Sequence, residues 1–154
     1  DIGRLDEAGY LEITDRKKEL LVTSGGKKIA PQPIETALRA DPLVSEAVLL
    51  GDARHFPAVL LVPDSGALSA RLNAARPATD AAAQALVDRP DVRSLYAAIV
   101  DTVNARLAQY ERIKKFSLLS REFTLTGGEL TPTLKVKRRI IEDRYRAEID
   151  AMYG

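Results

Sequence analysis

The chain has 154 residues, 45% of them apolar and 29% charged, a composition that indicates one globular domain rather than a disordered segment. Its 23 Lys and Arg residues nearly balance its 22 Asp and Glu residues, which argues against a dedicated nucleic-acid-binding protein. The lack of Cys excludes disulfides and Cys-based metal centres, and the single His55 argues against a His-rich metal site or a His-based triad, so we predict no metal site.

Short apolar runs and turn residues predict strands from the front of the chain onward. Residues 11–13 and 20–22 flank a charged cluster and are predicted to be paired strands, or a strand and a linker. Glycines 25 and 26 mark a turn after the second run. Further along, strands are predicted at 44–50, at the near-continuous apolar run 58–62, and at 116–119. The run at 58–62 is apolar enough to be covered on both faces.

Helices are predicted between and after these strands, at 34–39, 64–77, 79–87, 92–107 and 136–153. In the last of them, residues 141, 145, 149 and 152 lie along one apolar face. We expect Tyr145 to be a core residue and Tyr153, beside the end of the chain, to be loosely packed. Strands and helices alternate, so the predicted fold class is α+β. It consists of a small three-stranded sheet covered by helices, with an N-terminal two-stranded β-hairpin appendage.

Segment 112–139 carries eight basic and two acidic side chains. The cations at 135–139 stand at a helix start, where the helix dipole disfavours positive charge. Three interpretations remain open: a solvated helix face, an anion site at a helix N-terminus, or a non-enzymatic binding surface for nucleic acid or anionic membrane. The nucleic-acid interpretation lacks the interleaved aromatic side chains that stack on bases.

Two motifs at opposite ends of the chain carry more specific information. The front has Asp1, then Asp-Arg-Lys-Lys-Glu-Leu at 15–20, Gly-Lys-Lys-Ile-Ala-Pro at 26–31 and Ile-Glu at 34–35. The tail has Pro-Thr-Leu-Lys-Val-Lys-Arg at 132–138. In this order they resemble the carboxyl-terminal part of adenylate-forming acyl-CoA synthetases. The residues of the tail motif most resemble those of the long-chain fatty acid branch. The Gly-Gly-Lys-Lys run does not have the spacing of a P-loop.

The resemblance implies that Lys135 is the catalytic lysine of adenylation. A flexible ammonium group there would stabilise the charge that develops as pyrophosphate leaves ATP. Most of the family has Gly before this lysine, whereas this chain has Leu134. Lys137 is a nearby competitor, but the spacing of Thr133, Lys135 and Arg138 matches the family motif.

Further roles follow from the same resemblance, all of them in the front motif. Asp1 occupies the position that binds the ribose hydroxyls of ATP, and Arg16 the position of an arginine near the nucleotide. Lys18 occupies the hinge position. The resemblance implies that the loop with Gly25 and Gly26 approaches the pantetheine arm of CoA, since glycine permits close backbone approach, and that Lys27 and Lys28 assist with the CoA phosphates.

The resemblance also implies how the chain is organised and what it binds. The chain begins without Met, and we expect a fragment of a longer polypeptide. Residues 1–17 would end a large N-terminal domain and approach the hinge, and 18–154 would form a mobile C-terminal domain. The implied substrates are fatty acid, ATP and CoA, with Mg²⁺ bound in the N-terminal domain. We expect a cytoplasmic ligase that contacts the inner membrane face peripherally and binds no nucleic acid. The nearest alternative is a fatty acyl-AMP ligase that transfers to a carrier protein.

Overall fold

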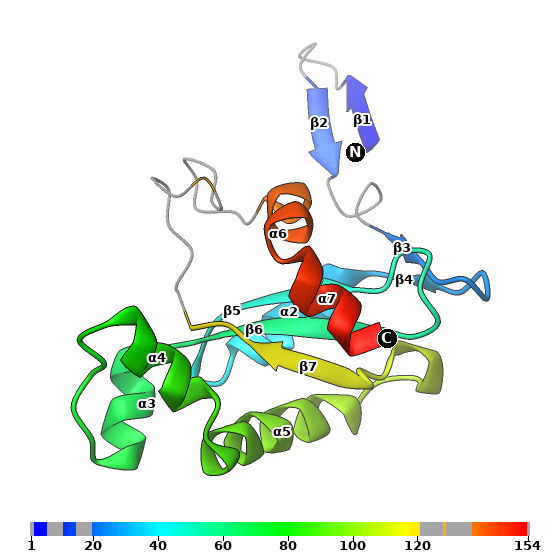
Figure 1. Cartoon of the computed structure of the whole chain (residues 1–154). Coiled ribbons are helices and arrows are strands. Elements are labelled where there is room, and N and C mark those ends of the chain that lie inside the picture. The colour runs from blue at the N-terminus through cyan, green and yellow to red at the C-terminus, as the bar shows by residue number, and fades with distance from the viewer. Residues whose placement is uncertain (1, 6–10, 15–19, 121–127, 129–136, 154) are drawn as a thin grey trace.

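The computed structural model describes residues 2–5, 11–14, 20–120, 128 and 137–153 (Figure 1). In chain order, the elements are β1 (Ile2–Leu5), β2 (Leu11–Thr14), β3 (Leu21–Val22), β4 (Lys28–Ile29), α2 (Pro31–Arg39), β5 (Val44–Leu50), β6 (Ala58–Pro63), α3 (Ser65–Leu72), α4 (Asp80–Val87), α5 (Pro90–Asn104), the 3-10 turn η1 (Gln109–Glu111), β7 (Lys115–Leu118), α6 (Arg138–Arg144) and α7 (Arg146–Tyr153).

A three-stranded sheet in the order β5-β6-β7 forms the centre of the domain. Strands β5 and β6 are antiparallel, and β7 runs parallel to β6. Every residue of β6 is buried, which confirms the prediction that this strand is covered on both faces. The three predicted strands of the sheet are therefore present, and the α+β fold class is confirmed.

The two faces of the sheet carry separate apolar clusters because successive side chains of a strand point to opposite sides. Leu49, Val59 and Leu61 pack with α2 and α5 on one face. Val48 and Leu60 pack on the other face with α6 and α7, which cross the sheet in orange and red in Figure 1. The C-terminal helices thus provide one complete cover of the sheet.

The N-terminal part contains two small antiparallel sheets, and their partners differ from the predicted pairing. Segments 11–13 and 20–22 both contain strands, but β2 pairs with β1 and β3 pairs with β4. The β3–β4 pair closes around Gly25 and Gly26, so β3 finds its partner within a few residues along the chain.

Some helix boundaries differ from the predicted ones, because single residues leave helical backbone geometry. Helix α3 ends at Asn73, which adopts a left-handed conformation (φ 54°, ψ 46°), well before Pro77. The predicted helix at 136–153 is two helices, because Tyr145 leaves helical geometry (φ −108°, ψ 27°). Helix α5 starts at Pro90, a residue suited to a first turn, and ends at Asn104. No helix within the described ranges is long and apolar enough to cross a membrane.

Candidate functional site

The turn between β3 and β4 brings Gly25, Gly26 and Lys27 together. The turn is closed by hydrogen bonds from the Gly26 N–H to the Thr23 carbonyl and from the Thr23 N–H to the Lys27 carbonyl, both 2.9 Å. Gly26 has a φ of +83°, a conformation that glycine adopts without steric strain. A Cβ atom added at Gly25 or Gly26 would meet no atom within 4 Å. The turn therefore presents exposed backbone that a ligand can approach closely.

The loop at 51–57, between β5 and β6, holds this turn in place. The Ser24 N–H donates to the Arg54 carbonyl at 2.9 Å, and the Ala53 N–H donates to the Val22 carbonyl at 2.8 Å. The Ser24 hydroxyl lies 3.2 Å from Nδ1 of His55, in the same loop. The turn is thus a fixed feature of the domain rather than an isolated hairpin tip.

Lys27 and Lys28 are both exposed on this turn. The ammonium group of Lys27 lies 5.6 Å from the ring centroid of Tyr110, a cation–π distance. This contact orients Lys27 toward η1. The arrangement places one cation beside the exposed glycines, as a site for an anionic ligand requires.

The opposite side of the same loop contacts the end of α7 through Tyr153. The Tyr153 hydroxyl donates to the Phe56 carbonyl at 2.8 Å, and the rings of Phe56 and Tyr153 lie 4.8 Å apart. The Arg54 guanidinium lies 4.7 Å from the Tyr153 ring and pairs with Asp150 at 2.8 Å. The prediction of a loosely packed Tyr153 is wrong, because ring contacts and one hydrogen bond hold it at the end of the chain.

Burial raises the pKa of the Tyr153 hydroxyl to about 12, although Arg54 acts in the opposite direction. A raised pKa means that the fold favours the protonated phenol. Its contribution to stability is present below pH 10 and is lost as the pH rises toward 12. We expect Tyr153→Phe to lower the free energy of unfolding by about 1 kcal/mol below pH 10.

Urea denaturation of the variant and the parent, from neutral pH to pH 12, would check this expectation. The decline in stability above pH 10 should be shallower in the variant than in the parent. An unchanged urea midpoint at neutral pH would contradict the assigned hydrogen bond.

A buried ion pair joins the front and tail sequence motifs across the domain. The carboxylate of Glu35, on α2, accepts a hydrogen bond from the Leu49 N–H at 2.7 Å and from Nη2 of Arg138 at 2.9 Å. Nη1 of Arg138 donates to the Leu49 carbonyl at 2.6 Å. The Glu35 and Arg138 side chains are only 7% and 19% exposed, so this is a largely buried ion pair. Both residues belong to the two sequence motifs, but no pattern in the sequence indicates that they pair.

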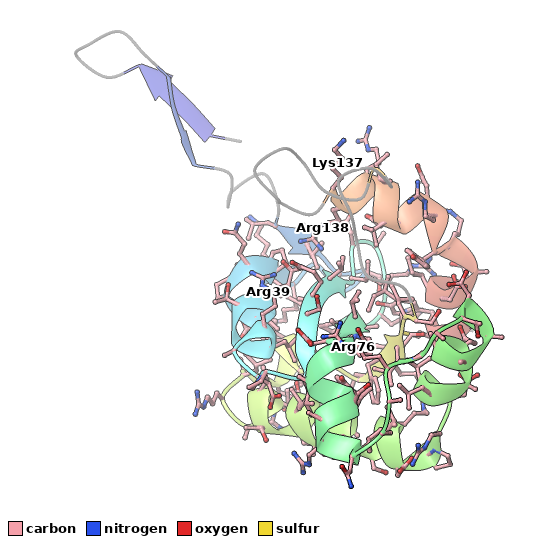
Figure 2. All side chains as sticks on the ribbon, turned by 90° about the vertical axis from the view of Figure 1, so that its left-hand side faces the viewer. Arg39, Arg76, Lys137 and Arg138 are labelled. Carbon is pink, nitrogen blue, oxygen red and sulfur yellow. The ribbon has the colours of Figure 1, made fainter. Side chains whose placement is uncertain are left out.

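Burial raises the pKa of Glu35, opposed chiefly by the positive charge of Arg138. Burial also raises the pKa of Glu46, on β5, whose carboxylate lies 3.7 Å from Nη1 of Arg39. Arg39 and Arg138 lie on the same side of the domain in Figure 2. The two arginines therefore compensate two carboxylates that the fold has removed from water.

A surface hollow of about 510 Å³ lies between the start of β3 and the last two helices. It is lined by Leu20, Leu21, Asp52, Arg138, Arg139, Glu142, Asp143 and Arg146. Its charged lining residues are three basic and three acidic, so the hollow has no strong preference for an anion.

Four of the predicted site residues, Asp1, Arg16, Lys18 and Lys135, lie outside the described residues. Their roles remain predictions. Lys137, the competitor of Lys135, is exposed at the start of α6, next to Arg138 (Figure 2).

Comparison with known proteins identifies the domain. The profile of the AMP-binding enzyme C-terminal domain matches residues 18–154. The chain belongs to this family. The resemblance drawn from the two motifs is thereby confirmed.

Two relatives show where such an AMP-binding C-terminal domain occurs. The long-chain-fatty-acid–CoA ligase FadD15 of Mycobacterium tuberculosis is 40% identical over 154 residues, which cover 100% of this chain and 26% of that protein. The human long-chain-fatty-acid–CoA ligase ACSBG1 is 35% identical over 171 residues, covering 99% of this chain and 24% of that protein. The chain thus spans about a quarter of the length of the curated relatives it matches.

Solved structures share the fold of this AMP-binding C-terminal domain. The adenylation domain of a carboxylate reductase from Mycobacterium chelonae has a TM-score of 0.72 at 25% identity, covering 94% of this chain and 21% of that chain. A fatty acyl CoA synthetase from Mycobacterium tuberculosis has a TM-score of 0.53 at 24% identity, covering 95% of this chain and 23% of that chain.

Proposed function

We propose that this chain is the C-terminal lobe of an ATP-dependent long-chain fatty acid–CoA ligase. The observation that carries the proposal is the 40% identity, over the whole chain, to a protein named as a long-chain-fatty-acid–CoA ligase. The exposed glycine turn supports it, because thioester formation needs a surface that the narrow pantetheine arm can approach.

The proposed reaction has two steps. A carboxylate oxygen of the fatty acid attacks the α-phosphorus of ATP, and the bond to pyrophosphate breaks to give acyl-AMP. The sulfur of CoA then attacks the acyl carbonyl, the bond to AMP breaks, and the thiol proton passes to solvent. In the first step, the ammonium group of Lys135 would bind the α-phosphate and carboxylate oxygens as negative charge develops.

In the second step, the turn at Gly25 and Gly26 would lie along the pantetheine arm, with Lys27 toward the CoA phosphates. One lobe serves both steps if it rotates about Lys18 between two positions. Asp1 would bind the ribose hydroxyls and Arg16 the nucleotide. Residues 1–17 would then belong to the end of the N-terminal domain, and 18–154 to the moving lobe.

The N-terminal domain would provide the fatty acid pocket, most of the ATP contacts and the Mg²⁺ site. Within the part of the chain that the structure describes, no group of three or more His, Asp or Glu side chains could hold a metal ion. Bound to the triphosphate, Mg²⁺ would neutralise part of its charge. The lobe contributes cations and exposed backbone instead.

We place the full enzyme in the cytoplasm, in peripheral contact with the inner membrane face, because long-chain fatty acids partition from water into apolar surroundings. Membrane flotation of the full-length protein, with and without high salt, would test this location.

The intact enzyme tests the proposal directly. Incubation with palmitate, ATP and Mg²⁺ should yield pyrophosphate and acyl-AMP, and addition of CoA should yield palmitoyl-CoA and AMP. A phosphopantetheinyl carrier protein in place of CoA separates this function from that of a fatty acyl-AMP ligase. Acylation of the carrier but not of CoA would replace our proposal with that alternative.

The isolated 154-residue chain is expected to fold without forming acyl-CoA. Two apolar clusters already cover both faces of its sheet, so folding does not require the N-terminal domain. Circular dichroism with urea unfolding checks the first part, and a palmitoyl-CoA assay checks the second. Turnover by the isolated chain would show that the substrate pocket lies within it, contrary to the proposal.

A further inference from the structure

The ion pair of Glu35 and Arg138 binds the backbone at one residue of the sheet. Among the strands that the structure describes, β5 pairs on one side only, because the order is β5-β6-β7. On its outer side, Leu49 donates its N–H to Glu35 and accepts at its carbonyl from Arg138. The two side chains also bond to each other at 2.9 Å. Each of the three residues is therefore bonded to the other two.

This closed arrangement fixes the position and direction of one particular helix start. Arg138 is the first residue of α6, and 103 positions separate it from Glu35. The Ile141 side chain, one turn further along, is fully buried against the sheet. The first turn of α6 is thus held by a buried ion pair at one point and by apolar packing at another.

Arg138, one member of this buried ion pair, lies close in the sequence to Lys135. Lys135 precedes Arg138 by only three positions, and Lys137 is the residue immediately before the helix. Three residues of extended chain span at most about 10 Å.

We propose that Glu35 and Arg138 are positioning residues for the adenylation step, which fix the point from which the Lys135 segment leaves the domain. This inference rests on the proposed function of Lys135. Neither residue needs to touch the substrate. Their effect should appear in the rate of acyl-AMP formation, because displacement of a catalytic group by about 1 Å lowers a rate by about 100-fold.

The experiment uses full-length enzyme carrying Arg138→Met, Arg138→Lys or Glu35→Gln. We expect Arg138→Met to lower kcat for acyl-AMP formation by about 10- to 100-fold, with KM for ATP and palmitate changed less than about two-fold. Thioester formation from pre-made acyl-AMP should stay within about two-fold of the parent. Arg138→Lys keeps the positive charge but lacks the planar guanidinium that bonds to two acceptors at once. It should therefore be faster than Arg138→Met but slower than the parent.

Tyr96→Phe is a matched control for lost stability. The fully buried Tyr96 hydroxyl donates to the Leu43 carbonyl at 2.6 Å, just before the other end of β5. Its removal also leaves a backbone carbonyl near this strand without its side-chain partner, but far along the strand from α6. The parent and all variants are assayed at one temperature, about 20 °C below the lowest melting temperature among them, so that every protein is folded and the rates are comparable. The control should keep both half-reactions at parental rates.

Equal losses in the Arg138 variants and in Tyr96→Phe would overturn the proposal and leave a purely structural role for the ion pair. Parental rates of adenylation in Arg138→Met would also overturn it. A parent enzyme that forms no acyl-AMP is a separate result, since it contradicts the proposed function itself.

Discussion

Replacement of Lys135 by Ala in the intact enzyme is expected to lower the rate of acyl-AMP formation by about 100- to 1,000-fold. The negative charge that develops at the α-phosphate would lose a cation placed within reach of it, while substrate pockets in the N-terminal domain remain. Pyrophosphate exchange into ATP measures this step. Thioester formation from pre-made acyl-AMP should continue, because that step uses the other position of the lobe.

Lys137→Ala is the matched control for this variant. Lys137 has the same charge, is exposed, and lies two positions further along, directly before α6. Its removal should change acyl-AMP formation by less than about two-fold. Collapse of adenylation in Lys137→Ala but not in Lys135→Ala would show that the motif spacing assigns the wrong lysine.

Replacement of Gly25 by Leu is expected to slow thioester formation and to leave acyl-AMP formation unchanged. A Cβ atom added at this position meets no atom within 4 Å, so the fold should tolerate the substitution. The added side chain would instead occupy the space through which the pantetheine arm approaches. We expect thioester formation to fall by about ten-fold or more while pyrophosphate exchange stays at the parental rate.

Two smaller substitutions define the cause of this loss. Gly25→Ala should have a milder effect, because a single methyl group takes up less of the approach. Gly26→Ala should in addition destabilise the domain by about 1–2 kcal/mol, because Gly26 has a φ of +83°. Parental thioester formation in Gly25→Leu would contradict the assignment of this turn to CoA.

The sequence predicts the central sheet well because its middle strand is apolar throughout. Strand β6 is buried at every position, so a continuous apolar run identifies it without knowledge of its partners. The strand order is a different matter, since a parallel β6–β7 pair depends on the path of the chain through α3, α4 and α5. The interruption at Tyr145 also escapes prediction, because the apolar periodicity continues across it.

In the candidate site, too, the sequence predicts what is local and not what the fold brings together. Gly25, Gly26 and Lys27 are adjacent in sequence, and the structure places them on one turn as expected. The pairing of Glu35 with Arg138 joins positions 103 residues apart, and no local pattern indicates which carboxylate meets which guanidinium. The packing of Tyr153 escapes prediction from its place beside the chain end, because its ring contacts arise only in the folded domain.

The bonds that Leu49 makes to two side chains also bear on how the domain avoids aggregation. An outer strand with unsatisfied N–H and carbonyl groups recruits strands from other molecules and leads to aggregation. At Leu49, both backbone groups are already occupied by Glu35 and Arg138. A lobe that turns away from its partner domain in each catalytic cycle would therefore expose no ready template for self-association at this point, whichever position it adopts.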